Sequence, residues 1–366
     1  MQKDTPSGRL VSLDAFRGLT IAGMVLVNNP GSWGNIYPPL EHAEWHGWTP
    51  TDLVFPFFLF IVGVSMAFSL GRRREESTRA ALYKKILWRG FVIFAIGFFL
   101  ANFPEFSAER FKITGVLQRI AVVFVLASML VLNSGWKTQL KLTLGILLGY
   151  WAAMTLIPVP GYGPGVLTIE GNLASYVDGI LLPGRRYHGT WDAEGILSTF
   201  PALATCLMGY LTGTFIRSGR SRSEIAGWMF VAGWGAILIS LFWDIWFPIN
   251  KGIWTSSYAV FTAGAALEFL AVCFWIIDVK GYGQWFKPAV VFGMNAIALY
   301  ALSEMTTSIL FTIKVGETSL YTWLYQTIFL SWLQPLNASL AFALTYVLIW
   351  YLLMYVLYRR RIFIKV

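Results

Sequence analysis

Charged side chains are scarce in this chain of 366 residues, where they make up 13% of the sequence. An ordinary soluble domain carries about 25%, so the shortage excludes a large soluble domain. Cysteine is scarce as well, and Cys206 and Cys273 both lie inside apolar runs. A disulfide framework is therefore not expected, nor is a metal site, because no cluster has metal-ligand spacing.

The sequence is instead rich in apolar residues, at 56%, and in aromatic residues, at 17%. Its 17 tryptophans would suit a membrane–water interface, where the amphipathic indole ring lies at headgroup level. The net charge of +9 could suggest nucleic acid. However, the basic residues form short clusters between apolar runs, which is typical of membrane topology. We therefore expect a lipid bilayer as the partner, and no nucleic acid.

A transmembrane helix needs about 20 mostly apolar residues, and ten segments of the sequence approach this length. They are residues 10–29, 51–70, 86–103, 114–133, 141–158, 196–216, 226–246, 258–277, 288–310 and 336–358. The sequence thus predicts an all-α polytopic membrane protein with about ten transmembrane helices in a single domain over residues 1–366. No internal repeat is visible, which counts against the common inverted-repeat transporters.

The distribution of Lys and Arg predicts the orientation. Basic residues follow every second span, as in GRRREESTRAALYKK (71–85) and RSGRSRSE (217–224), and are few in the alternate connections. Because cytoplasmic loops are enriched in Lys and Arg, both termini are expected in the cytoplasm. The loop around His42 and the long loop at about 159–195 then face outward. In a bacterium the location would be the cytoplasmic (inner) membrane, with these loops in the periplasm.

Polar side chains from distant segments converge on the predicted outer end. Ionisable residues near membrane spans are costly and indicate function by default. These residues are Asn28, His42, His46, Asp52, Gln118, Arg119, Asp192, Glu194, Asp244, Asn250 and Lys251. Position alone does not choose between the two histidines, and Arg119 could equally form a structural ion pair with Asp52 or Asp192.

The predicted inner half holds fewer polar groups. Asp14 and Arg17 are three residues apart, so one helical face could hold them as a pair. Such a pair is more often structural than catalytic. Arg89 and Asn295 lie at a similar depth.

These residues suit one kind of reaction. Histidine is the usual general base near neutral pH, and a neutral amide such as that of Asn28 could stabilise an oxyanion. A base, a carboxylate and an amide donor together favour acyl transfer to an amine or hydroxyl. Composition does not separate this hypothesis from a proton-coupled sugar permease.

Several motifs, in order, resemble the heparan-α-glucosaminide N-acetyltransferase family of transmembrane acyltransferases. They are SLDAFRGLTIAGMVLVNN, HAEWHGWTPTDLVFPFFLFIVGVS, ITGVLQRI, DAEGILSTFPALATCLMGYLTG, PINKGIWTSSYAV and FGMNAIALY. The resemblance covers nearly the whole chain and suggests a compact bacterial relative. It implies transfer of acetyl from cytoplasmic acetyl-CoA to the amino group of a glucosamine-type sugar.

The resemblance also implies roles for individual residues. His42, followed by Trp45 and Asp52, matches the essential histidine motif, whereas His46 falls where the lysosomal enzyme has asparagine. His42 would be the general base, Asn28 would polarise the thioester and Asp52 would orient the base. The acceptor-binding residues would be Trp45, Gln118, Arg119, Asp192, Glu194, Asn250 and Lys251. From their inner position, Arg17, Arg89 and Asn295 are expected near the nucleotide of acetyl-CoA.

Alternatives remain open from the sequence. Direct transfer is preferred, but a covalent acetyl-histidine route is not separated from it. The rival functions are a sugar permease with His42 as proton relay and an O-acyltransferase acting on a cell-envelope glycan. The natural acceptor and the oligomeric state stay undetermined, a homodimer included.

Overall fold

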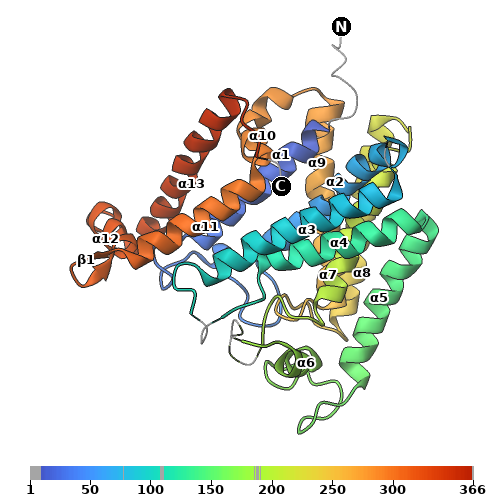
Figure 1. The fold of residues 1–366 in the computed structure, drawn as a ribbon, viewed down its shortest axis with the longest axis horizontal. Helices are drawn as coiled ribbons and strands as arrows, with labels where there is room; N and C mark the ends of the chain where they lie inside the picture. Colours follow the sequence, from blue (N-terminus) through green and yellow to red (C-terminus); the bar gives the residue numbers. More distant parts are fainter. Residues whose placement is uncertain are drawn as a thin grey trace.

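The computed structural model describes residues 10–76, 78–107, 111–184, 186, 189 and 191–364. In these residues nearly all of the regular secondary structure is helical (Figure 1). The strands found there are a small antiparallel pair, β1 (Lys314–Val315) and β2 (Thr318–Ser319). The predicted all-α class is thus confirmed for the described part of the chain.

Each predicted span coincides with a helix or with two consecutive helices. In chain order they are α1 (Val11–Asn28), α2 (Val54–Glu76), α3 (Arg79–Asn102), α4 (Val116–Asn133), α5 (Trp136–Leu156), α7 (Thr199–Ile216), α8 (Arg222–Asp244), α9 (Ser256–Phe274), α10 (Lys287–Met294) with α11 (Ala296–Thr312), and α13 (Pro335–Arg359).

Eight of these helices are long and apolar enough to cross a membrane, and the pair α10 and α11 would make a ninth span. α5 has 21 residues but includes Lys137 and Lys141 near its start, and is less apolar. The protein is therefore a multi-pass membrane protein, while the predicted count of about ten spans stays a prediction.

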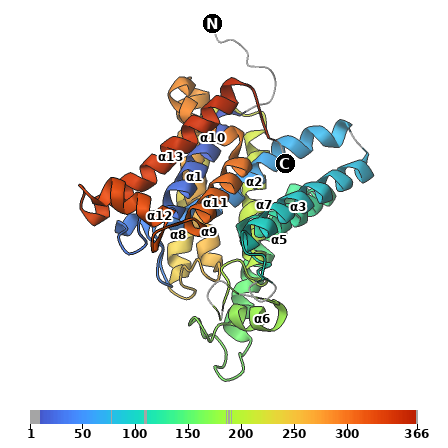
Figure 2. The ribbon, with the colours of Figure 1, turned by 60° about the vertical axis from the view of Figure 1, so that its left-hand side comes forward.

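Short elements complete the connections. They are the helical turns η1 (Pro38–Leu40), η2 (Pro50–Leu53) and η4 (Gly283–Phe286), the π-helical segments η3 (Trp275–Val279) and η5 (Tyr325–Leu330), and the helices α6 (Leu173–Leu181) and α12 (Leu320–Leu324). α6 belongs to the predicted outer loop and lies apart from the main helical body, at the bottom of Figure 1 and of Figure 2.

The outer surface of the helical body is apolar. On α8, Val231, Trp234, Leu238 and Phe242 are each more than half exposed. A soluble monomer rarely exposes such a continuous apolar face, whereas lipid tails would cover it at no cost. The exposed face of α8 therefore fits a helix at the lipid boundary.

Helices α2 and α7 pack backbone to backbone through glycine. A Cβ atom at Gly63 would lie 1.9 Å from the carbonyl oxygen of Cys206, and one at Gly209 would lie 2.1 Å from that of Phe60. Small residues permit this close approach, which drives helix association where no hydrophobic effect is available. The pair therefore holds the outer ends of α2 and α7 in fixed relative positions.

The segment predicted as the span 288–310 is bent, because the chain turns by 66° between α10 and α11. Asn295 occupies the break. A Cβ at Gly18 of α1 would lie 1.6 Å from the carbonyl oxygen of Ala289, and one at Gly293 would lie 2.1 Å from that of Asp14. α1 therefore packs directly on α10, and α11 leaves this contact at an angle.

Loops from alternate connections meet at one end of the molecule. The amide of Gly31 donates to Ser339 O at 3.2 Å, and that of Gly47 donates to Ile249 O at 2.7 Å. These are the connections that the Lys and Arg bias assigns to the outer side, so we call this end the outer end. Its orientation relative to the membrane stays a prediction.

Candidate active site

The entry to α2 builds a buried carboxylate at the outer end. Thr49 caps η2, and the side chain of Asp52 accepts hydrogen bonds from the amides of Ala43 and Thr49, both at 3.0 Å. Tyr258 of α9 donates to the carbonyl oxygen of Asp52 at 2.6 Å. Asp52 is fully buried, so its position is determined by the fold.

Asp52 in turn orients His42. The Nδ1 atom of His42 lies 2.7 Å from Oδ1 of Asp52, and 46% of the histidine side chain is exposed. A carboxylate bonded to one ring nitrogen sets the tautomer and the direction of the ring. Asp52 therefore holds the imidazole at Nδ1, while Nε2 lies 3.4 Å from Nζ of Lys251 and the ring remains partly exposed at the outer end.

Lys251 is the third member of this arrangement. Its Nζ atom lies 2.9 Å from Nδ1 of His42 and 3.1 Å from Oδ1 of Asp52. Burial lowers the pKa of Lys251, while the negative charges of Asp52 and Glu194 oppose that shift. We call His42, Asp52 and Lys251 the His42 cluster.

Asn250 shapes the loop that presents Lys251. It is fully buried, and its Oδ1 atom accepts from the backbone amide of Ile253 at 3.1 Å. The backbone amide of Asn250 donates to Thr255 Oγ1 at 3.0 Å. The side-chain amide of Asn250 also lies 3.3 Å from Nδ1 of His46. Asn250, which was predicted to bind the acceptor sugar, is thus buried next to the His42 cluster.

His46 has different surroundings from His42. Partial burial lowers its pKa, and Asp244 opposes that shift. The carboxylate bonded to a histidine in this loop is that of Asp52, and it reaches His42. This contact distinguishes the two histidines, which their positions in the sequence did not.

Aromatic rings from two outer loops pack beside the cluster. The indole N–H of Trp45 donates to Leu167 O at 2.7 Å, and its ring meets that of Trp191 edge to face at 5.1 Å. A Cβ at Gly252, next to Lys251, would lie 2.8 Å from Trp45. Trp45 therefore links the loop of His42, the long outer loop and the loop of Lys251.

Two acidic residues just before α7, Asp192 and Glu194, form a second group of polar side chains, which we call the acidic layer. Asp192 is buried, accepts from Thr114 Oγ1 at 2.7 Å and from the amide of Glu194 at 2.9 Å, and lies 3.9 Å from Lys112. Burial raises the pKa of Glu194 and the charge of Asp192 adds to the shift, while Arg119, Lys112 and Lys251 oppose it.

Arg119 and Gln118 lie in the interior at the start of α4. A guanidinium nitrogen of Arg119 donates to Gly195 O at 2.9 Å and to Ser198 Oγ, and the group stacks 5.2 Å from the ring of Trp254. Gln118 is also buried and donates to Thr114 O. Arg119 therefore ties α4 to the turn that begins α7, in place of the ion pair with Asp52 considered from sequence.

Asn28, the last residue of α1, contacts a residue that the sequence analysis missed. Its Nδ2 atom donates to Oε1 of Glu304 in α11 at 3.1 Å. Glu304 is a single carboxyl group within the apolar segment of α11, and an ionisable residue in a span is by itself an indication of function. That signal could have identified Glu304.

Asp178 of α6 was also missed. Its Oδ1 atom accepts from the amide of Ile196 at 2.8 Å, and a Cβ at Gly195 would lie 1.8 Å from Oδ2. Burial raises its pKa to about 6, with the hydrogen bond from Ile196 and the charge of Arg119 opposing the shift. Asp178 therefore connects α6 to the turn that holds Glu194.

The three residues predicted to bind acetyl-CoA lie in two separate places. Arg17 lies 3.2 Å from Asp14, donates to Ser65 Oγ at 2.8 Å and reaches Gly293 O beside the helix break. Asn295, in the break, binds the C-terminal tail, because it donates to Ile362 O and accepts from the amide of Ile364. Arg89 lies on α3, with its guanidinium 5.1 Å from the ring of Phe124.

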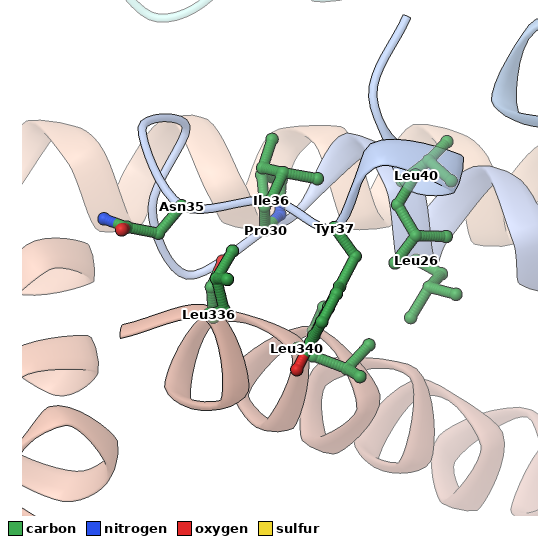
Figure 3. A pocket seen from close by; sticks show the side chains of 11 residues that line it. Leu26, Pro30, Asn35, Ile36, Tyr37, Leu40, Leu336 and Leu340 are labelled. Atoms are coloured by element: carbon green, nitrogen blue, oxygen red, sulfur yellow. The ribbon is translucent and has the colours of Figure 1, made fainter. Parts of the chain in front are cut away.

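One pocket is lined by none of the residues of the His42 cluster. Figure 3 shows it between the outer loop, with Ile36, Tyr37 and Leu40, and α13, with Leu336 and Leu340. No carboxylate, lysine, arginine or histidine is among the residues that line it. The pocket is lined mainly by apolar side chains, with Asn35, Tyr37 and Ser339 as its polar members, and lacks the charged groups and the histidine of the proposed site.

Comparison with known proteins gives a consistent result. The family model described as heparan-alpha-glucosaminide N-acetyltransferase, catalytic, matches residues 9–242. The heparan-alpha-glucosaminide N-acetyltransferase of Homo sapiens is 28% identical over 98% of this chain and 60% of that protein. The Mus musculus protein of the same name is 27% identical over 98% of this chain and 61% of its own length. The chain thus spans about three fifths of these relatives.

Proposed function

Because the chain belongs to the family of the heparan-alpha-glucosaminide N-acetyltransferase catalytic region, we propose that it is an integral membrane acetyltransferase. It moves the acetyl group of acetyl-CoA to the amino group of a glucosamine-type sugar. The observation that carries the proposal is the half-exposed ring of His42 bonded at 2.7 Å to the buried carboxylate of Asp52. A base oriented in this way suits the removal of a proton from an attacking nucleophile.

The reaction is a direct transfer. The amine nitrogen attacks the thioester carbonyl carbon, the C–N bond forms, and His42 takes the proton that the nitrogen loses. The amide of Asn28 donates a hydrogen bond to the carbonyl oxygen as negative charge develops there. When the C–S bond breaks, the CoA sulfur leaves and accepts the proton that His42 carries.

The acceptor sugar binds at the outer end. Trp45 offers an aromatic face, and the carboxylates of Asp192 and Glu194 can accept hydrogen bonds from sugar hydroxyls or from the amine. Lys251 contacts His42 and Asp52 directly, so it is positioned to act on the same reacting group. The buried residues Gln118, Arg119 and Asn250 support the walls of this site.

The donor comes from the cytoplasm, and both termini lie on that side of a bacterial inner membrane. In this proposal Arg17 and Arg89 supply the positive charge that attracts the nucleotide phosphates. An extended pantetheine arm reaches roughly 15–20 Å, judged from covalent dimensions, and an apolar bilayer core is about 30 Å thick. A thioester held from the inner side can therefore reach deep into the helical body.

The test is turnover by the purified protein in liposomes with labelled acetyl-CoA and glucosamine. Label in N-acetylglucosamine supports the proposal. Sugar uptake that needs no acetyl-CoA, without labelled product, would instead identify a permease. Label recovered on a hydroxyl of a glycan would identify an O-acyltransferase.

A further inference from the structure

Glu304 is an ionisable side chain in an apolar segment, where burying a charged group costs free energy. It lies in the apolar helix α11, away from both ends of that helix. A carboxyl group within a span is costly and persists where it has a function. Its hydrogen-bond partner is the side chain of Asn28, 276 residues away in sequence, at 3.1 Å.

The adjacent asparagine already performs the structural task of joining α1 to α11. Asn29 is buried, its Nδ2 atom donates to Val25 O at 2.8 Å, and its Oδ1 atom accepts from Thr307 of α11 at 2.5 Å. Thr307 also contacts the hydroxyl of Tyr346 of α13 at 3.0 Å. The end of α1 is therefore anchored without Glu304, so the contact with Asn28 needs another explanation.

The chemistry of the Asn28 side-chain amide explains its contact with Glu304. An asparagine side chain has two N–H donors on Nδ2 and an acceptor on Oδ1, and the group can be turned over at little steric cost. An ionised carboxylate offers only acceptors. In the structure Oε1 of Glu304 accepts from Nδ2 of Asn28, which places that end of the amide toward α11. One N–H is then bonded to Glu304, and the second N–H keeps a defined direction.

We propose that Glu304 is a positioning residue for acetyl transfer, which fixes the amide of Asn28 so that its second N–H points at the thioester carbonyl oxygen. This inference rests on the proposed function and assigns a role to a residue outside the recognised motifs. Glu304 acts through Asn28 and does not itself contact the reacting atoms.

The first experiment is a double-mutant cycle with Asn28→Ala, Glu304→Gln and the two together. Loss of one oxyanion donor costs about 100- to 1,000-fold in kcat, which we expect for Asn28→Ala. Glutamine keeps the size of Glu304 but offers a donor as well as acceptors, so Asn28 can turn over. We expect kcat to fall roughly tenfold, the size of one net hydrogen bond, with KM for glucosamine unchanged.

The cycle separates positioning from a purely structural role. If Glu304 acts through Asn28, the double variant loses no more activity than Asn28→Ala alone. The matched control is Glu268→Gln on α9, which changes another carboxyl group within an apolar span. We expect this control to keep wild-type kcat.

The second experiment measures the thioester directly in the His42→Ala background, which does not consume acetyl-CoA. The infrared carbonyl stretch of bound ¹³C-acetyl-CoA should lie below its value in water. Asn28→Ala and Glu304→Gln should both move it back toward that value, and Glu268→Gln should not.

The outcomes separate this inference from the proposed function. Wild-type turnover with no change in Glu304→Gln, or additive losses in the double variant, would overturn the role of Glu304 and leave the enzyme assignment intact. A carbonyl shift that depends on Glu304, without acetyl transfer to glucosamine, would support the role and refute the proposed acceptor. Failure to bind acetyl-CoA would overturn both.

Discussion

His42 and His46 lie in the same loop but have different partners. His42 is bonded to the buried carboxylate of Asp52 and contacts Lys251, whereas His46 meets the side-chain amide of Asn250. Since an oriented ring is what a general base requires, the roles of the two histidines should be separable by substitution.

We predict that His42→Ala nearly abolishes acetyl transfer and leaves acetyl-CoA binding largely intact. Removal of a general base typically costs a factor of about 100 to 10,000. His46→Asn should keep most of the activity, because asparagine retains polar contact with Asn250. Turnover in liposomes measures both, with size exclusion as the folding control. An inactive His46→Asn protein beside an active His42→Ala protein would reverse the assignment.

Asp178 should make stability depend on pH. Burial raises its pKa from an ordinary value of 3.8 to about 6 in the folded protein. The neutral form therefore favours the folded state below about pH 4, and this stability is lost as pH rises through 6. Asp178→Asn removes the ionisation but keeps an acceptor for the amide of Ile196. We predict that the variant is more stable than wild type by about 1–2 kcal/mol at pH 8.

Thermal unfolding in detergent at pH 4 and pH 8 checks the behaviour of Asp178. The difference between variant and wild type should be small at pH 4, where the wild-type carboxyl is largely neutral. An equal difference at both pH values would show that ionisation of Asp178 is not its cause.

At the scale of the elements, contact between α2 and α7 positions the site. α2 begins two residues after Asp52, and α7 begins directly after Ser198, which binds Arg119. The carbonyl oxygens of each helix lie against glycines of the other. A shift of one helix would therefore move the His42 cluster relative to the acidic layer.

We predict that Gly209→Ala destabilises the protein by at least about 1–3 kcal/mol, the usual cost of overpacking. Its new Cβ would lie 2.1 Å from a backbone carbonyl oxygen that cannot move independently. Gly227→Ala on α8 is the matched control, because nothing lies within 4 Å of its Cβ position. Thermal unfolding should show a lower midpoint for Gly209→Ala and an unchanged or slightly higher one for Gly227→Ala.

We predict that residues near the helix break between α10 and α11 contribute to acetyl-CoA binding. Arg17 reaches the carbonyl of Gly293 at this break. Arg17→Ala and Arg89→Ala should weaken acetyl-CoA binding by several-fold, with a smaller effect on glucosamine, because each removes a cation from the inner half. Binding isotherms for the two ligands test this, and the opposite ranking would refute the donor assignment.

At the scale of the whole molecule, loops from separate connections gather at the outer end, while the bonds of Arg222 to Asp278 and of Tyr83 to Asn133 lie at the other end. This segregation agrees with the distribution of Lys and Arg along the sequence. The two ends are therefore expected to face different compartments.

We predict that a cysteine placed at position 42 reacts with an impermeant reagent in intact cells, and that one at position 220 does not. The side chains are exposed to similar extents, 46% at His42 and 50% at Arg220, so accessibility to water alone would not distinguish them. Both cysteines should react once the membrane is made permeable. Labelling at 220 and not at 42 in intact cells would invert the topology.

The sequence by itself determined the class of the molecule. Helices in a bilayer must satisfy their own backbone groups, so apolar length is enough to locate them, and each of the ten predicted segments is helical. The orientation that the charge bias assigns to these helices stays a prediction. Two of the residues predicted together at the outer end, His42 and Lys251, lie in contact.

Only the tertiary structure decided which atoms meet. Burial by η2 and α9 directs Asp52 to His42, and the approach of α11 to α1 gives Asn28 its partner Glu304. The bend at Asn295 depends on contact between α1 and α10, which no local pattern describes. Hydrophobic periodicity reports the environment of one helix at a time, whereas hydrogen bonds between distant residues depend on how the helices pack around one another.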